Sequence, residues 1–352
     1  MIRYNDIVCT NVHNVWHIKR GYSLKHSRQR FSTSKLSILI LIIIVGVLSY
    51  IGFHYINPTI AKGLIIGSGE INPKSLSAKI SISTKDLSTK DESYVLIDPQ
   101  TTQPLKSYNA ELKRAPASTT KLLTGLIVMK TLQETDIVRV GTEVNIEGSQ
   151  LGLNPGDQIS VHELLTALYV HSSNDAAAAL AVKISGSIPA FAEEMNKYAA
   201  SLGCKDSHFM NPHGMPDPDH YTTANDLGEI ASQFLKNEVL MKFVKEPSAH
   251  IQWKDARGMV RYADVQNTNS LLGIYPGDKG LKTGTTSEAA QCLVSYVTRS
   301  DGELLLVLLG SKNRYSDTIK LLDEGWADQR SKAALRELAK DPKSLILSPG
   351  IF

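Results

Sequence analysis

Apolar positions divide the chain into one uninterrupted apolar run near its start and periodic segments after it. Residues 36–53 carry no charge, and a basic segment precedes them. A helix needs about 20 apolar residues to cross a bilayer, so this run approaches the required length. We therefore expect one transmembrane signal anchor over residues 36–56. The positive-inside rule then puts the basic head, residues 1–35, in the cytoplasm and everything after the anchor outside.

Two other interpretations of the apolar run remain open. A cleaved signal peptide would have its cleavage site near residues 59–61, but secretory signals span only about 15–30 residues in all. Here the head before the apolar run is itself 35 residues long. A buried core helix is disfavoured because the run has no polar face and adjoins seven lysines and arginines. We favour an uncleaved anchor in the bacterial cytoplasmic membrane, with a single pass.

The pattern changes after the anchor to short apolar runs that alternate with helical periodicity. Residues 57–90 are mostly polar and predict a stalk, followed by a catalytic domain at 91–327 and a C-terminal tail at 328–352. Strand, helices, then strands and a helix predict an α/β (α+β) class. In chain order we expect a strand at 94–98, a helix at 117–132, a helical region at 162–182 broken at 171–174, a helix starting at 222–226, strands at 259–264, 291–297 and 304–309, and a helix from about 317.

Composition narrows the class of protein. The chain has 352 residues, 42% of them hydrophobic, and a formal net charge of +3. These values are compatible with one large domain or two modest ones, and they favour neither disorder nor dedicated nucleic-acid binding. Three cysteines do not make a disulfide framework at this length. Cys204 and Cys292 could pair only if the fold brings them together, and two ordinary buried thiols are the simpler interpretation.

A serine and a lysine in Ser118-Thr-Thr-Lys121 form the first candidate for chemistry. Residues i and i+3 share a helix face, and a serine hydroxyl needs an adjacent base to become a nucleophile. A lysine supplies that base when burial or a nearby cation keeps it neutral. The same spacing recurs at residues 32–35, so this motif is weak alone.

Two further motifs follow along the chain. Ser172-Ser-Asn174 offers a hydroxyl that relays a proton and an amide that both donates to and accepts from a peptide bond. Lys282-Thr-Gly284 offers a cation and a hydroxyl for a carboxylate, and a glycine that allows close backbone approach. Each of them alone equally fits a polar loop or a turn. Their combination and order are far more specific.

Taken together, the three motifs resemble the signature of the penicillin-binding and serine β-lactamase superfamily. The resemblance extends over about residues 91–327 and is strongest to low-molecular-mass D-alanyl-D-alanine carboxypeptidases. It implies a β-lactamase/transpeptidase-like fold, in which helices flank an antiparallel sheet and form a helical subdomain. The matching stretches are residues 114–124 (RAPASTTKLLT), 153–158 (LNPGDQ), 170–176 (VHSSNDA), 211–214 (NPHG), 220–224 (HYTTA) and 280–284 (GLKTG).

The resemblance implies a role for each motif residue. Removal of the terminal D-alanine from peptidoglycan stem peptides would proceed through an acyl-enzyme, with β-lactams as inhibitors and with neither metal nor cofactor. The implied roles are nucleophile for Ser118, base for Lys121, proton relay for Ser172, acyl-chain binding for Asn174, carboxylate binding for Lys282 and Thr283, close approach for Gly284, and an oxyanion-hole N–H for Thr285 beside that of Ser118.

The chain departs from the family pattern at two motif positions. Thr285 stands where histidine is common, and Ser173 where glycine is common. We expect activity to survive both departures, with an altered substrate preference from Thr285 and only a small effect from Ser173. We also expect the chain to lack the β-rich C-terminal domain and amphipathic membrane helix of many members, and to be tethered by its N-terminal helix instead.

Four further functions compete with this one. A D,D-endopeptidase would use the same residues on peptidoglycan crosslinks, and a non-catalytic β-lactam sensor would keep the fold. A class A β-lactamase needs a loop glutamate, whereas Glu193 and Glu194 lie in a helical stretch. A zinc peptidase is disfavoured because His208, His213 and His220 follow no ligand pattern.

Overall fold

The structure, a computed structural model, describes residues 92–300 and 302–340. These residues belong to one compact unit, Ser83–Phe352. The predicted head, anchor and stalk lie outside the described residues, as does the end of the predicted tail. Among the residues that are described, no helix is long and apolar enough to cross a membrane.

A five-stranded antiparallel sheet forms the centre of the unit, in the order β2-β1-β9-β8-β7. The predicted strand near 94–98 and the predicted hairpin at 291–309 are confirmed as β1 and as β8 and β9, whose turn brings Arg299 opposite Gly302. Residues 304–309 are buried without exception because both faces of β9 are covered. The strands are β1 (Ser93–Asp98), β2 (Gln103–Tyr108), β7 (Asp278–Thr286), β8 (Ala290–Arg299) and β9 (Gly302–Ser311).

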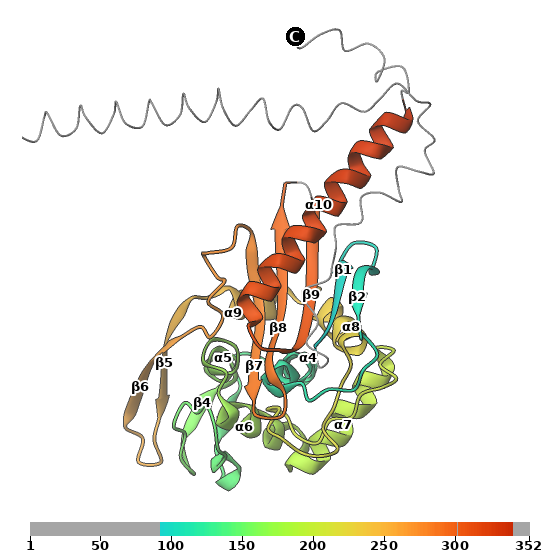
Figure 1. The fold of residues 1–352 in the computed structure, drawn as a ribbon. Coiled ribbons are helices and arrows are strands. Elements are labelled where there is room, and N and C mark those ends of the chain that lie inside the picture. The colour runs from blue at the N-terminus through green and yellow to red at the C-terminus, as the bar shows by residue number, and fades with distance from the viewer. Residues whose placement is uncertain (1–91, 301, 341–352) are drawn as a thin grey trace, which may run out of the picture. The chain divides into compact units, whose positions relative to one another are not determined.

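Alternate side chains of β9 belong to different cores. Leu304, Leu306 and Leu308 pack with Trp326 of helix α10 (Arg314–Lys340) on one face of the sheet. Leu305, Val307 and Leu309 pack into the helical body on the other face. Figure 1 shows α10 lying across the sheet in front and α4 and α8 behind it. The predicted domain boundary at residue 327 falls inside α10, which is continuous to Lys340.

Helices of the second face build a helical subdomain. The predicted helix at 117–132 is confirmed, but its first turn is a 3₁₀ segment, η2 (Ala117–Thr120). The predicted break at 171–174 is also confirmed: a π-helical turn, η4 (Ala167–His171), ends where Ser172 takes the left-handed conformation. The remaining helices are α4 (Lys121–Thr131), α5 (Val161–Thr166), α6 (Asn174–Ser185), α7 (Ile188–Ser201), α8 (Ala224–Leu235), α9 (Glu238–Lys245) and the short η3 (Thr142–Val144).

A second, four-stranded antiparallel sheet borders the helical subdomain, in the order β3-β4-β5-β6. Sequence periodicity predicted only the last of these strands. The small sheet is formed by β3 (Ile137–Arg139), β4 (Gln158–Ser160), β5 (Ser248–Lys254) and β6 (Val260–Gln266). The predicted α+β class, with an antiparallel sheet flanked by helices, is confirmed.

Candidate active site

All three motifs meet at one pocket of about 240 Å³, which we call the serine pocket. It lies where η2, the turn before α6 and strand β7 approach one another. The pocket is lined by six residues of the motif regions, Ser118, Ser172, Asn174, Thr283, Gly284 and Thr285. Its remaining lining residues are Gly148, Ser149, Gly214, Met215, Thr268, Thr286 and Arg314. Lys121 and Lys282 are buried beside these residues. Every predicted site residue is therefore in or beside one cavity.

A strained turn places Ser118 just before the N-terminus of α4. Ala117, just before it, has a positive φ of 48°, which is rare for a residue with a side chain. The hydroxyls of Thr119 and Thr120 donate to the carbonyls of Pro116 and Ala117 and hold the turn. Ser118 itself keeps partial exposure, as a nucleophile requires.

Lys121 makes three hydrogen bonds although its side chain is fully buried. Its Nζ donates to Ser118 Oγ at 2.8 Å, to Asn174 Oδ1 at 2.7 Å and to the carbonyl of His213 at 2.8 Å. Burial, and then the charge of Lys282, hold the pKa of Lys121 well below its usual range, while Asp175 acts in the opposite direction. The neutral amine is therefore accessible beside Ser118.

The second motif is fixed by the turn between η4 and α6. Ser172 has a positive φ of 65° and is 6% exposed at the pocket wall. Asn174 joins Lys121 to the opposite loop, because its Nδ2 donates to the carbonyl of Glu147 at 2.7 Å. The carboxylate of Asp175 accepts from three backbone N–H groups of residues 151–153 and anchors that loop.

The third motif lies inside strand β7, an element that the sequence pattern did not predict. Lys282 is 1% exposed and donates to the carbonyl of Thr283. Burial, and secondarily the charge of Arg314, lowers the pKa of Lys282 to about 7. A Cβ on Gly284 would lie 3.0 Å from Ser118 N and from the carbonyl oxygen of Pro116, a tight contact, so the glycine helps β7 to approach the serine this closely.

Arg314, at the start of α10, is one of the pocket residues that the sequence interpretation missed. Its guanidinium donates to the carbonyls of Gly284 and Cys292 and, at 2.6 Å, to Thr285 Oγ1. Thr268 was also missed; its hydroxyl lies 2.6 Å from that of Thr283. Neither belongs to a motif, and only the pairing of β7 with β8 and β9 brings α10 to the pocket.

The three histidines have packing and loop roles. His213 contributes its backbone carbonyl to Lys121, and His220 Nε2 lies 3.0 Å from Thr120 Oγ1. Burial lowers the pKa of His220 to about 4, which leaves the ring neutral. His208 is half-buried, and its Nδ1 lies 2.7 Å from the carbonyl oxygen of Asp219. Within residues 92–300 and 302–340, no group of His, Cys, Asp and Glu could hold a metal ion.

The two glutamates considered for a class A β-lactamase lie away from the reactive serine. Glu193 is exposed on α7 and pairs with Lys197, and neither it nor Glu194 lines the serine pocket. The cysteines do not form a bridge either: Cys204 and Cys292 are both free thiols, as the simpler interpretation predicted, although only Cys292 is buried and Cys204 is half-buried.

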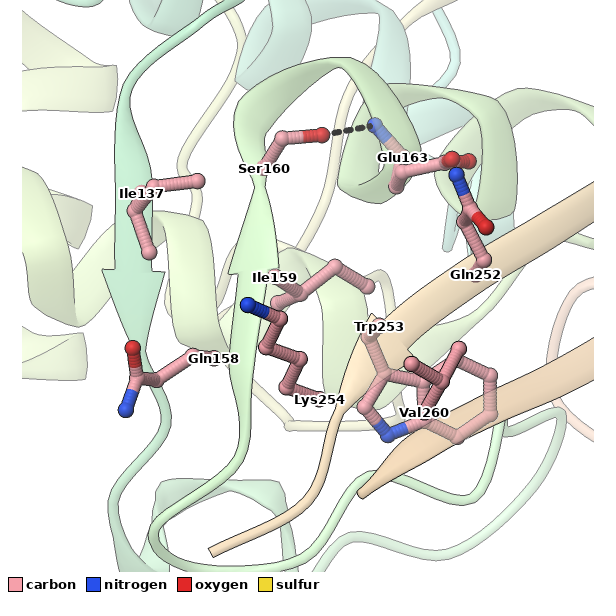
Figure 2. A pocket seen from close by; sticks show the side chains of 9 residues that line it. All are labelled: Ile137, Gln158, Ile159, Ser160, Glu163, Gln252, Trp253, Lys254 and Val260. Carbon is pink, nitrogen blue, oxygen red and sulfur yellow. Dashed lines mark hydrogen bonds between the residues drawn. The ribbon is translucent and has the colours of Figure 1, made fainter. Parts of the chain in front are cut away.

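A larger cavity of about 370 Å³, the small-sheet pocket, lies between α5 and the small sheet. Figure 2 shows Ile137, Ile159, Trp253 and Val260 around it, with Gln158, Lys254 and Gln252 at its edges. Its serine, Ser160, accepts a hydrogen bond from the backbone N–H of Glu163 and caps α5. No lining lysine bonds that hydroxyl, so the cavity contains no activated nucleophile.

Comparison with known proteins finds similarity over most of the chain. A family model described as D-alanyl-D-alanine carboxypeptidase (peptidase S11) matches residues 80–313. The D-alanyl-D-alanine carboxypeptidase DacF of Bacillus subtilis is 34% identical over 68% of this chain and 63% of its own length. The chain therefore spans less than two thirds of that relative.

Solved structures show the same fold. The crystal structure of the Streptomyces K15 DD-transpeptidase is 31% identical, with a TM-score of 0.64 over 66% of this chain and 96% of that chain. Penicillin-binding protein 6B of Escherichia coli is 33% identical, with a TM-score of 0.58 over 66% of this chain and 75% of that chain. The similarity covers the unit that contains the serine pocket.

Proposed function

Because the chain belongs to the D-alanyl-D-alanine carboxypeptidase family, we propose that it is a serine D,D-carboxypeptidase that removes the terminal D-alanine from peptidoglycan stem peptides. One observation carries the proposal: the Nζ of a fully buried lysine lies 2.8 Å from the hydroxyl of the partly exposed Ser118. A serine with such a base beside it is suited to nucleophilic attack on a carbonyl.

The contacts of Lys121 explain how it would act as the base. A neutral amine has two N–H donors and one lone pair. Asn174 Oδ1 and the carbonyl of His213 accept the two N–H bonds, which leaves the lone pair directed at Ser118 Oγ. Lys121 would take the hydroxyl proton as Ser118 Oγ bonds to the carbonyl carbon of the penultimate D-alanine.

Breakdown of the tetrahedral intermediate requires a proton on the leaving amine. We assign this transfer to Ser172, which lines the same pocket and would pass the proton from Lys121 to the departing D-alanine as the C–N bond breaks. The backbone N–H groups of Ser118 and Thr285 would bind the oxyanion; one such donor typically contributes about 10²–10³ in rate. Asn174 would also bind the acyl chain.

The terminal carboxylate of the substrate would bind where the serine pocket is bordered by β7 and by the start of α10. Lys282, Thr283 and Arg314 supply two cations and a hydroxyl there, and Arg314 is held by Thr285 Oγ1 and by two carbonyls. A guanidinium with a fixed orientation binds a carboxylate through paired hydrogen bonds. Thr285, where histidine is common, would thus act on substrate preference through Arg314.

The acyl-enzyme is resolved by whichever acceptor reaches it. Water gives carboxypeptidase activity, whereas an amine gives transpeptidation, the activity named in the solved Streptomyces K15 structure. A D,D-endopeptidase would acylate Ser118 with a crosslinked strand instead. β-Lactams would trap Ser118 in every case, and a non-catalytic sensor would go no further than that step.

For location, we infer a single-pass anchor over residues 36–56 in the bacterial cytoplasmic membrane, with the pocket outside. The support is the uncharged run of residues 36–53 and the basic head before it. Protease treatment of intact spheroplasts should degrade the pocket-bearing part and spare an epitope at residues 1–35. Protection of both ends would contradict the proposed topology.

The test of the activity compares the full-length protein with its Ser118→Ala variant on an acyl-Lys-D-Ala-D-Ala peptide. We expect free D-alanine from the parent only, together with covalent labelling of the parent by a fluorescent penicillin. Labelling without release from this peptide or from crosslinked muropeptides would favour the sensor. Release from crosslinked muropeptides alone would favour the endopeptidase.

A further inference from the structure

A cavity of about 540 Å³, which we call the Arg114 pocket, adjoins the serine pocket. The two cavities are lined by neighbouring residues of the same three segments. In each segment one residue lines the Arg114 pocket and a near neighbour lines the serine pocket. The pairs, with the residue of the Arg114 pocket first, are Ala115 and Ser118, Pro216 and Met215, and Glu288 and Thr286. The full lining of the Arg114 pocket is Lys113, Arg114, Ala115, Pro216, Asp217, Pro218, His220, Tyr221 and Glu288.

Most polar groups of the Arg114 pocket already have partners. Lys113 lies over the ring of Tyr221 and pairs with Asp206. Asp217 Oδ1 accepts from the backbone of Asp219, and neutral His220 is held by Thr120 and Met210.

Two opposite charges are left without a counterion. Arg114 is partly exposed, and its guanidinium makes no hydrogen bond or ion pair with any residue in the described part of the chain. Glu288 is exposed, and its carboxylate accepts hydrogen bonds from its own turn, from the hydroxyls of Ser287 and Thr286 and from its own backbone N–H, but forms no ion pair within that same part. A ligand group that matches both must carry a negative and a positive charge close together.

The path of the substrate leads to this pocket. In the proposed function the C-terminal carboxylate binds at Lys282, Thr283 and Arg314, and the scissile carbonyl lies between Ser118 N and Thr285 N. A peptide that lies extended against β7 then runs past Thr286 toward Glu288. Extended chains advance about 3.3 Å per residue, so the residue before D-Ala-D-Ala reaches the turn that bears Glu288.

We propose that the Arg114 pocket binds the third residue of the stem peptide, and that it selects a side chain ending in an adjacent ammonium and carboxylate. Arg114 would bind the carboxylate and Glu288 the ammonium. This inference rests on the proposed function and names the substrate class of that same site: stem peptides whose third residue is a diamino diacid rather than a simple diamino acid such as lysine.

The experiment measures kcat/KM for D-alanine release from three acyl-X-D-Ala-D-Ala peptides. X is meso-diaminopimelate, lysine or norleucine, which end in both charges, the ammonium alone or neither. We expect the parent to prefer the diaminopimelyl peptide over the lysyl peptide by about tenfold, the size of one hydrogen bond to a charged group. Arg114→Gln should remove that preference, and Glu288→Gln should remove the preference for lysine over norleucine.

Arg257→Gln, on the distant turn between β5 and β6, is the matched control and should keep the parent's ratios. Fluorescent-penicillin labelling of each variant reports whether Ser118 remains reactive. Because Glu288 is exposed on a turn, its variant serves as the second test should Arg114→Gln fail to fold. Equal kcat/KM for the three peptides, or unchanged ratios in both variants, would overturn the inference. No release from any peptide would instead contradict the proposed function.

Discussion

The serine pocket and the small-sheet pocket are each bordered by a serine, a lysine and neighbouring strands. They differ in how deeply the lysine is buried and in whether the serine hydroxyl is already used in a structural hydrogen bond. In the serine pocket Lys121 and Lys282 are almost wholly buried, with lowered pKa values. In the small-sheet pocket Lys254 is exposed and Ser160 is occupied with capping a helix. The small-sheet pocket is the larger of the two, at about 370 Å³ against about 240 Å³.

This difference shows that cavity size does not locate the chemistry. Burial of a lysine destabilises its charged form, and a protein accepts that cost where the neutral amine is useful. Strained backbone conformations also lie beside the serine pocket rather than beside the small-sheet pocket. Ala117 and Ser172, both with positive φ, flank the serine pocket, whereas the positive φ in the hairpin beside the small-sheet pocket belongs to a glycine.

The largest difference between the two pockets should come from replacing one lysine of each with alanine. Lys121→Ala removes the base beside Ser118, and we expect D-alanine release and penicillin labelling to fall by about 10³, within the range of general-base catalysis. Lys254→Ala should change neither rate by more than about twofold, as expected for a surface substitution. Stopped-flow labelling measures both rates, and circular dichroism checks the fold. Comparable losses of rate in the two variants would contradict the proposal that only the lysine of the serine pocket acts in the reaction.

A second contrast concerns two glycines. Gly284→Ala puts a Cβ 3.0 Å from Ser118 N, so β7 must move away from the oxyanion hole, and we expect kcat to fall by about 10². Gly258→Ala, on the β5–β6 turn, meets nothing within 4 Å but has a φ of +81°.

That second change should cost about 1 kcal/mol of unfolding free energy, because an αL backbone disfavours a side chain, and leave kcat intact. Urea unfolding and D-alanine release together separate the two outcomes. A normal kcat in Gly284→Ala would mean that β7 does not contribute to the hole.

A pH profile gives the third contrast. The pKa of Lys282 is lowered to about 7, so Lys282 is protonated below that pH and neutral above it. If the charged form binds the substrate carboxylate, kcat/KM of the free enzyme should fall by about tenfold per pH unit above about 7. Lys282→Arg keeps the charge and should remove this limb, since arginine stays protonated. An unshifted limb in the variant would assign the titration to another group.

The smallest effect on activity is expected from the small-sheet pocket itself. Trp253 Nε1 donates to Asp157 Oδ2 at 2.8 Å, and Asp157 is 2% exposed. Trp253→Phe should lower the unfolding free energy by about 1–3 kcal/mol, because a buried carboxylate oxygen loses one of its two donors and keeps only the backbone N–H of Asn154. Release of D-alanine should stay at the parental rate. A large loss of kcat at unchanged stability would show that the small-sheet pocket takes part in the reaction.

Several elements were predictable because their causes are local. Ser118 and Lys121 share a face at a spacing of three residues, and the break at Ser172 was visible as a polar interruption in a helical region. The central strands were visible because long runs such as 304–309 are buried on both faces. Strand β7 was not, since its buried residues include Asp278, Lys282 and Thr283, which break the apolar pattern.

The short strands of the small sheet escaped prediction for a different reason. β3 and β4 have three residues each and exist through their pairing with each other, and β4 then adjoins β5, far along the chain. No periodicity can be measured over so few positions.

The sequence by itself determined the family, the three motifs and the identity of the candidate nucleophile and base, because these depend on residue type and on spacing within one turn. Tertiary structure alone decided that Lys121 is desolvated between Asn174 and the carbonyl of His213, that Arg314 joins Thr285, and that Arg114 and Glu288 border one cavity. The physical reason is that a pKa, a fixed guanidinium and a charged pocket all depend on groups that only chain folding brings within a few ångströms.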